Sequence, residues 1–81
     1  MLEGISSDNL IVGLRRSTKA IEHGGAQCVY VAQDIAPPLL DSIVNLAKAY
    51  NVPLKKVSSK SELGKACKID VAASVVVVKK Q

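Results

Sequence analysis

Residues 10–21 of this chain read Leu-Ile-Val-Gly-Leu-Arg-Arg-Ser-Thr-Lys-Ala-Ile. The apolar triplet that opens this stretch predicts a short strand, and the glycine after it ends that strand. Leu14, Thr18 and Ile21 then recur at helical spacing, so we predict a helix over residues 15–23 with these side chains on its inner face. A strand followed by a helix that buries one face is the basic unit of a layered α/β fold.

The same helix carries a basic face made of Arg15, Arg16 and Lys19. Arg15 and Lys19 are four residues apart, and like charges at that spacing destabilise an isolated helix by about 0.2–0.5 kcal/mol. We interpret all three cations as lying in the first turn, where the helix dipole disfavours positive charge. An anionic partner would offset both effects, because its phosphates would meet the cations and the free backbone N–H groups. A solvated basic face without a ligand is the alternative explanation of this stretch.

The remainder of the chain continues the alternation of strands and helices. In chain order we predict a short helix over 2–8, a strand over 27–33, a helix opened by Pro37-Pro38, a strand over 54–57, a helix from Ser59 to Cys67, a connection over 68–72 and a strand over 73–78. Both faces of the strand over 27–33 are apolar, and the strand over 73–78 is almost continuously apolar, as buried central strands require. Helices between strands therefore predict a sheet covered on both faces.

Two local signals mark the ends of helices. The Gly24-Gly25 pair should end the first basic helix, since glycine adopts the left-handed cap conformation without strain. Ser59 followed three residues later by Glu62 fits a capping box at the start of the last helix.

Length and composition set the broad class. The chain has 81 residues, of which 48% are hydrophobic, so we expect one globular domain over residues 1–81. Its longest apolar run is far shorter than the roughly 20 residues of a membrane span. No secretory signal is visible at the N-terminus. We therefore expect a cytoplasmic monomer that does not contact membranes.

The net charge of +4 is unevenly distributed. Residues 13–23 hold three cations and one acid, and residues 55–68 hold five lysines and one acid. If these two windows meet in space, they form a patch suited to nucleic acid or to an acidic membrane surface. The alternative is a scatter of solvated lysines.

Signals for catalysis or metal binding are missing from the sequence. Cys28 and Cys67 are far apart and sit among apolar neighbours, which favours buried free thiols. His23 is the sole histidine, which argues against a histidine-based metal site. No glycine-rich phosphate loop is present. We expect no cofactor, no metal and no enzymatic activity, and we place the only aromatic residues, Tyr30 and Tyr50, in or near the core.

Three segments in the same order resemble one family. Residues 13–19, Gly-Leu-Arg-Arg-Ser-Thr-Lys, resemble the Gly-x-Asn-Glu-x-Thr-Lys signature of the L7Ae family of ribosomal proteins, whose members bind kink-turn RNA. Residues 59–67 resemble the family's Ser-Lys…Leu-Gly-x-Ala-Cys block, and residues 71–75 resemble its closing strand. The length and the run over 25–34 resemble small bacterial members of the YbxF type.

The resemblance implies a three-layer α/β/α sandwich with a four-stranded mixed sheet. It also implies an RNA partner, possibly ribosomal RNA, in the form of a kink-turn: sheared G·A pairs beside a bulge that bends the duplex. The major groove of an ordinary RNA duplex is too narrow to admit a helix. A sharp kink would open that groove to Gly13 and the first helical turn, with Lys19 beside a phosphate.

The resemblance also implies which positions contact RNA. In this chain the matching residues are Gly13, Leu14, Arg15, Arg16, Lys19, Ala36, Leu40, Lys60, Ile69, Asp70, Val71 and Ala72. The segment from Ile69 to Ala72 matches the apolar loop that family members place on an extruded nucleotide. Ordinary core packing is the alternative for Ile69 and Val71.

Two positions depart from the family pattern. Arg15-Arg16 replaces the Asn-Glu pair that reads the G·A edges. Arginine can donate two hydrogen bonds to guanine, but it cannot accept one as glutamate does. Lys68 replaces a glycine before the apolar loop. We conclude from the sequence that this is a non-catalytic, ribosome-associated RNA-binding module. The alternative is a small α/β protein-interaction or regulatory module with a basic docking surface, whose binding would survive nuclease treatment of the partner.

Overall fold

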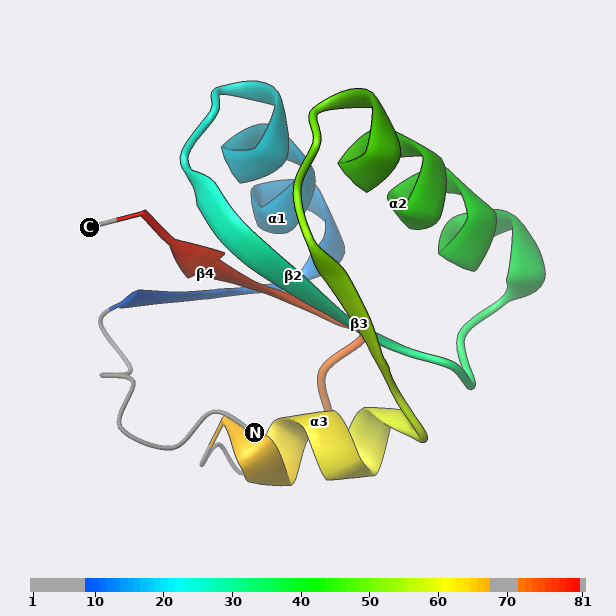
Figure 1. Ribbon diagram of the computed structural model, residues 1–81. Coiled ribbons are helices and arrows are strands. Elements are labelled where there is room, and N and C mark those ends of the chain that lie inside the picture. Colours follow the sequence, from blue (N-terminus) through cyan, green and yellow to red (C-terminus); the bar gives the residue numbers. More distant parts are fainter. Residues whose placement is uncertain (1–8, 68–71, 81) are drawn as a thin grey trace.

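The computed structural model describes residues 9–67 and 72–80, and strands and helices alternate along them (Figure 1). The elements are β1 (Leu10–Val12), α1 (Leu14–Glu22), β2 (Ala26–Ala32), α2 (Pro37–Ala49), β3 (Leu54–Val57), α3 (Lys60–Ala66) and β4 (Val75–Lys79). This order confirms the strand–helix alternation expected over 10–80. The short helix expected over residues 2–8 lies outside the described residues.

The four strands form one mixed sheet in the order β1-β4-β2-β3. Strand β4 runs antiparallel to both of its neighbours, whereas β2 and β3 are parallel. The sequence pattern predicted a central position for the apolar run near the C-terminus, and Val75 to Val78 are indeed all buried between β1 and β2. Such a strand needs cover on both faces, because each face carries valine side chains.

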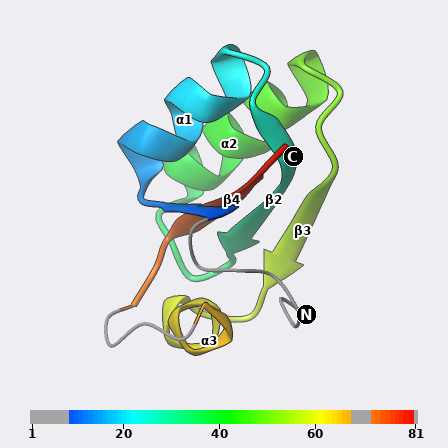
Figure 2. The same cartoon turned by 90° about the vertical axis from the view of Figure 1, so that its left-hand side faces the viewer.

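Helices provide that cover in two separate layers. Helices α1 and α2 pack together on one face of the sheet, and α3 lies on the other (Figure 2). Ile11 and Val29 both pair with Val77, so the three side chains share the face under α1 and α2. The fold is therefore the three-layer α/β/α sandwich with a four-stranded mixed sheet that the family resemblance implied.

The observed boundaries differ from the expected ones for local reasons. Helix α1 begins one residue earlier, because the Ser17 N–H donates to the Gly13 carbonyl at 3.0 Å and makes Gly13 the N-cap. Strand β4 begins at Val75, not at Ala73, because the Ala73 N–H bonds to the Lys60 carbonyl and not to a neighbouring strand. Residues 68–71 of the expected connection lie outside the described part.

Helix ends and side-chain burial confirm most of the other predictions. Gly24 has φ +75°, and the N–H groups of Gly24 and Gly25 donate to the carbonyls of Ile21 and Ala20, which closes α1 as expected. Both cysteines are free thiols, but only Cys67 is buried as predicted, and Cys28 is half-buried. Burial raises the pKa of the Cys67 thiol. The placement of Tyr50 near the core was wrong: its side chain is 47% exposed, since it follows the last turn of α2.

Candidate nucleic-acid interface

One end of the sheet gathers the starts of all three helices. Strands β1, β2 and β3 finish there, β4 begins there, and α1, α2 and α3 each follow one of the finishing strands (Figure 1). We call this edge the Gly13 end. Three helix dipoles direct their positive ends toward it, which favours an anionic ligand outside the carboxyl ends of the strands.

Backbone hydrogen bonds hold the segments of the Gly13 end together. The Gly13 N–H donates to the Val75 carbonyl at 3.0 Å, and the Ala32 N–H donates to the Ser74 carbonyl at 2.9 Å. These two bonds fix the start of β4 between the ends of β1 and β2. The backbone at this end is therefore anchored to the buried centre of the sheet.

The Asp34 side chain extends this network to α3. Its Oδ1 accepts a hydrogen bond from the Lys60 N–H at 2.9 Å, and the Lys60 carbonyl accepts one from the Ala73 N–H at 3.1 Å. The loop after β2, the start of α3 and the segment before β4 are thus joined through one residue. No local sequence signal singles out Asp34, because its partner Lys60 lies far along the chain.

The three helix starts differ in the N–H groups that they leave free. Helix α3 is capped by Ser59, whose Oγ accepts from the Glu62 N–H at 3.1 Å as the capping box predicted. Helix α2 begins with two prolines, which have no N–H, and its Leu39 N–H donates to the Ala36 carbonyl. Helix α1 has neither a side-chain cap nor an acid in its first turn. Its first amides are therefore the ones available to an external anion.

Gly13 shapes the approach to the first turn of α1. Its backbone has φ +113° and ψ 150°, a conformation that residues with a side chain rarely adopt. A Cβ atom built on Gly13 would meet nothing within 4 Å. The turn is therefore both dependent on glycine and open, so that a ligand can approach its backbone closely.

Ser17 ties α1 to β1 beneath this turn. It is fully buried, and its Oγ donates to the Ile11 carbonyl at 3.3 Å. The apolar spacing predicted an inner face of Leu14, Thr18 and Ile21 and did not include Ser17, because a lone serine in a helix is normally exposed.

We expect Ser17→Ala to lower the free energy of unfolding by about 1 kcal/mol, the usual net value of one buried hydrogen bond. Urea denaturation of the two proteins measures this difference. Thr18→Val is the matched control, since its hydroxyl bonds only to the Leu14 carbonyl of the same helix. An unchanged midpoint for Ser17→Ala would show that the contact with Ile11 adds no stability.

The cations of α1 are all solvent-exposed, but they do not all lie where the sequence suggested. Arg15 and Arg16 are in the first turn, whereas Lys19 is in the last turn, where the dipole favours a cation. The expectation that all three oppose the dipole was wrong for Lys19, because the helix has only nine residues.

The two basic windows do not merge into one patch. Helix α1 packs on β1, β4 and α2, whereas α3 packs on β2 and β3 on the opposite face. Lys55 and Lys56 are exposed on β3, at the sheet edge farthest from β1. Of the second window, Lys60 reaches the Gly13 end, because it begins α3 and bonds to Asp34.

The remaining positions implied by the family resemblance lie in the connected loops. Ala36 is the exposed N-cap of α2, and Leu40 is half-buried in the first turn of that helix. Lys60 and Ala72 are exposed. Ile69, Asp70 and Val71 lie outside the described residues, so neither their loop role nor the core alternative is tested.

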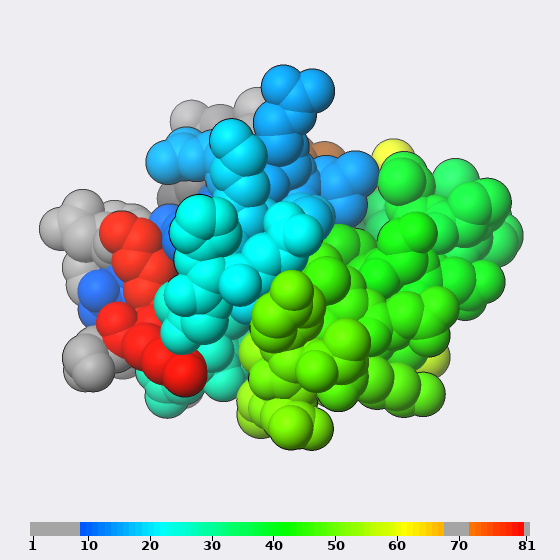
Figure 3. Space-filling view, turned by 90° about the horizontal axis from the view of Figure 1, so that it is seen from above, coloured from blue at the N-terminus to red at the C-terminus, as the bar shows by residue number. Residues whose placement is uncertain are grey.

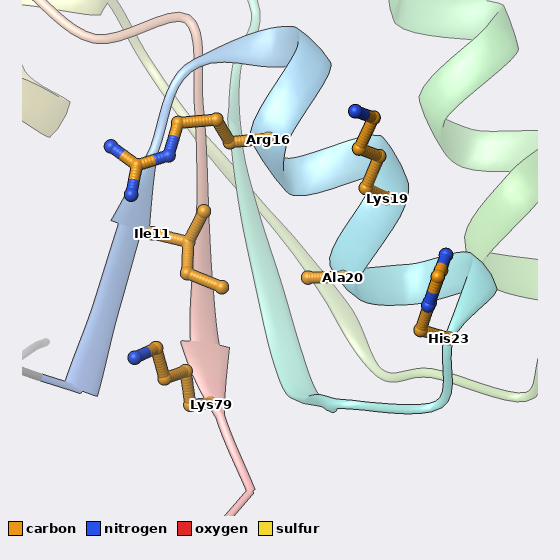
Figure 4. Close-up of a pocket in the computed structure, with 6 residues that line it drawn as sticks. All are labelled: Ile11, Arg16, Lys19, Ala20, His23 and Lys79. Carbon is orange, nitrogen blue, oxygen red and sulfur yellow. The ribbon is translucent and has the colours of Figure 1, made fainter.

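A shallow hollow adjoins the basic face of α1 and was not anticipated from the sequence. It has a volume of about 460 Å³ and lies between α1 and the strands β1 and β4 (Figure 4). Its lining residues are Ile11, Arg16, Lys19, Ala20, His23 and Lys79, and we call it the basic hollow. The sequence could not show it, since Lys79 is remote from the α1 residues in the chain.

We also searched the described part of the chain for a metal site and for a membrane-spanning helix. Residues 9–67 and 72–80 contain no group of three or more histidine, cysteine or acidic side chains placed to hold a metal ion. Within the same residues, no helix has the length and apolar character needed to cross a membrane.

Comparison with known proteins supplies the family. Residues 5–81 match the model of the ribosomal protein L7Ae/L30e/S12e/Gadd45 family. The chain belongs to this family. An RNA-binding protein of Geobacillus sp. (strain WCH70) is 39% identical over 91% of this chain and 90% of its own length. The RNA-binding protein YbxF of Geobacillus stearothermophilus is 35% identical over the same shares.

Two solved structures share the fold of this chain. The 15.5 kD RNA binding protein of Giardia lamblia superposes with a TM-score of 0.83 at 25% identity, over 91% of this chain and 62% of that one. A Bacillus halodurans protein of unknown function gives the same TM-score at 23% identity, over 91% of this chain and 74% of that chain.

Proposed function

We propose that this chain is a single-domain, non-catalytic RNA-binding protein that recognises kink-turn RNA through its Gly13 end. The observation that supports this most directly is the start of α1. Free N–H groups, an open glycine turn and two arginines occur together there, and no acid lies in the first turn. The names of its relatives, which describe RNA-binding proteins, support the same partner.

The physical basis of recognition is access to base edges. A helix cannot enter the narrow major groove of a regular RNA duplex. At a kink the groove is splayed, and the first turn of α1 enters with Gly13 against the backbone. Arg15 and Arg16 then donate to the O6 and N7 atoms of guanine in the exposed G·A pairs. Phosphates near the turn accept from the free N–H groups of α1.

The loops beside α1 complete the proposed interface. Ala36, Leu40, Lys60 and Ala72 lie on segments that Asp34 and the Lys60 backbone connect, and we propose that they contact the nucleotide that the kink extrudes. Ile69, Asp70 and Val71 are assigned to the same role by the family resemblance alone. Leu40 supplies an apolar contact for the base, and Lys60 supplies a cation for its phosphate. We further propose that the protein is a cytoplasmic monomer that associates with the ribosome.

Salt dependence tests the phosphate contacts. If about five cations neutralise phosphates, log K should fall against log salt with a slope of roughly −3.5 to −4.5, taking about −0.7 to −0.9 per contact. Lys19→Ala should flatten the slope by about one unit, as measured by fluorescence anisotropy titrations between about 50 and 200 mM salt.

The matched control for Lys19 is Lys55→Ala, which removes another exposed lysine, on β3 at the far edge of the sheet. This control should keep the slope of the unmodified protein. A slope that does not change in Lys19→Ala would remove Lys19 from the phosphate contacts.

A further inference from the structure

We propose that the basic hollow is a second phosphate-binding surface, which takes the backbone of the RNA stem that leads away from the kink. This inference rests on the proposed function and extends it beyond the Gly13 end. It assigns a role to Lys79 and His23, which lie outside the kink-binding positions, and it places Arg16 and Lys19 at the junction of the two surfaces.

The spacing of residues on α1 creates one wall of the hollow. Arg16, Lys19, Ala20 and His23 follow the spacing of three and four residues that puts side chains on one helix face. From Arg16 to His23 this wall runs for about 10 Å, at about 1.5 Å per residue. It starts in the first turn and ends at the C-cap of the helix. The wall is therefore a continuous path from the Gly13 end to the opposite end of the sheet.

Lys79 forms the far side of the hollow and is held firmly. It is the last residue of β4, lies two residues after Val77 and so points to the α1 face of the sheet. The register pairs it with Ala26, and the adjacent Lys80 N–H donates to the Gly25 carbonyl at 2.9 Å. Figure 3 shows this end of β4 beside the loop that follows α1. Lys79 is thus positioned by the strand and not by a loose tail.

The chemistry of the lining fits a phosphate backbone. Basic side chains make up four of the six lining residues, and no carboxylate is among them. In Figure 4 Arg16 and Lys79 extend to the same side, one on either side of Ile11, while Lys19 and His23 stand along α1. The small, apolar floor of Ile11 and Ala20 lets a polyanion approach closely without offering acceptors that compete for the cations. Because the hollow is shallow and follows one face of α1, it suits an extended chain of phosphates.

The test compares RNAs that differ only in stem length. A kink-turn RNA with short stems would be matched with two RNAs in which one stem at a time is extended by half a helical turn. We expect one extended RNA to bind more tightly than the short RNA. One added phosphate contact changes the slope of log K against log salt by about 0.7–0.9. At 0.1 M salt this corresponds to an affinity about five- to eightfold higher.

Variants of Lys79 test whether the hollow causes the tighter binding of the extended RNA. Lys79→Gln should remove the gain while leaving the affinity for the short RNA unchanged, and Lys79→Arg, which keeps the charge, should retain it. Lys56→Gln, at an exposed lysine on β3, is the matched control and should also retain the gain. Circular dichroism verifies that each variant is folded.

Two results would overturn this proposal. The first is equal affinity for the short RNA and both extended RNAs, and the second is an equal loss on all three RNAs in Lys79→Gln. Neither result bears on kink recognition, because kink recognition is tested by comparing the affinities for the short kink-turn RNA and for a straight RNA. Failure of the short RNA to bind better than its straight control would instead refute the proposed function.

Discussion

Gly13→Ala should weaken binding of a kink-turn RNA at least roughly tenfold, which corresponds to about 1.4 kcal/mol. The reason is the backbone at this position, where φ is +113°. An alanine there either holds a conformation that is unfavourable by about 1–3 kcal/mol or shifts the turn. A shifted turn moves the free N–H groups of α1 and both arginines away from the RNA. The added methyl group also occupies the open space through which the backbone of the RNA would approach.

The other end of α1 provides a matched control. Gly24 also has a positive φ, +75°, and a Cβ atom there would also meet nothing within 4 Å. Gly24→Ala should therefore destabilise the protein, by about 1 kcal/mol, without weakening binding of a kink-turn RNA with short stems, provided that both variants are assayed where they are folded. Equal affinities of the Gly13 and Gly24 variants for the RNA would contradict a role for the Gly13 turn in recognition.

The sequence predicted the fold well because its strands and helices are locally consistent. The apolar run at the start of β4 could be accommodated only at the centre of a sheet, and Gly24-Gly25 and Ser59 marked helix ends with a known geometry. The boundary errors were of one or two residues. At the start of β4 the error arose because the Ala73 N–H bonds to a distant partner, the Lys60 carbonyl.

The candidate interface was predicted only in part, because its organisation depends on contacts distant in sequence. The motif around Gly13 identified the α1 turn, but nothing local indicated that Asp34 accepts from the Lys60 N–H or that Ser17 bonds to β1. Whether the two basic windows form one patch also depends on how distant segments pack. In the fold the sheet lies between most of their residues. Lys79 lies beside α1 because β4 pairs with β2 in a register that sets Lys79 opposite Ala26. No local sequence pattern predicts that register.

The largest expected effect is discrimination between bent and straight RNA. Phosphate contacts position a protein but carry no base identity, so a basic surface alone should bind any duplex about equally. Recognition through the first turn of α1 requires a splayed groove with exposed G·A edges. Base contacts by Arg15 and Arg16, at about 1–3 kcal/mol for each good bidentate pair, are lost when that groove is closed. We expect at least roughly tenfold weaker binding to a straight duplex.

Arg15→Ala separates base reading from charge. This variant should reduce the difference between the two RNAs more than it lowers the affinity for the straight one, since a base contact exists only in the kink. Lys56→Ala removes the same charge from β3 and should leave the ratio of affinities unchanged. A ratio that is the same in Arg15→Ala and Lys56→Ala would assign Arg15 to phosphate contacts only.

The measurement that tests the central claim most directly uses the unmodified protein and two RNAs of equal length. One forms a kink-turn; in the other, Watson–Crick pairs replace the G·A pairs and the bulge is removed. Dissociation constants determined at near-physiological salt should differ at least roughly tenfold in favour of the kink-turn. Equal dissociation constants would contradict kink-turn recognition and would leave only a non-specific basic surface.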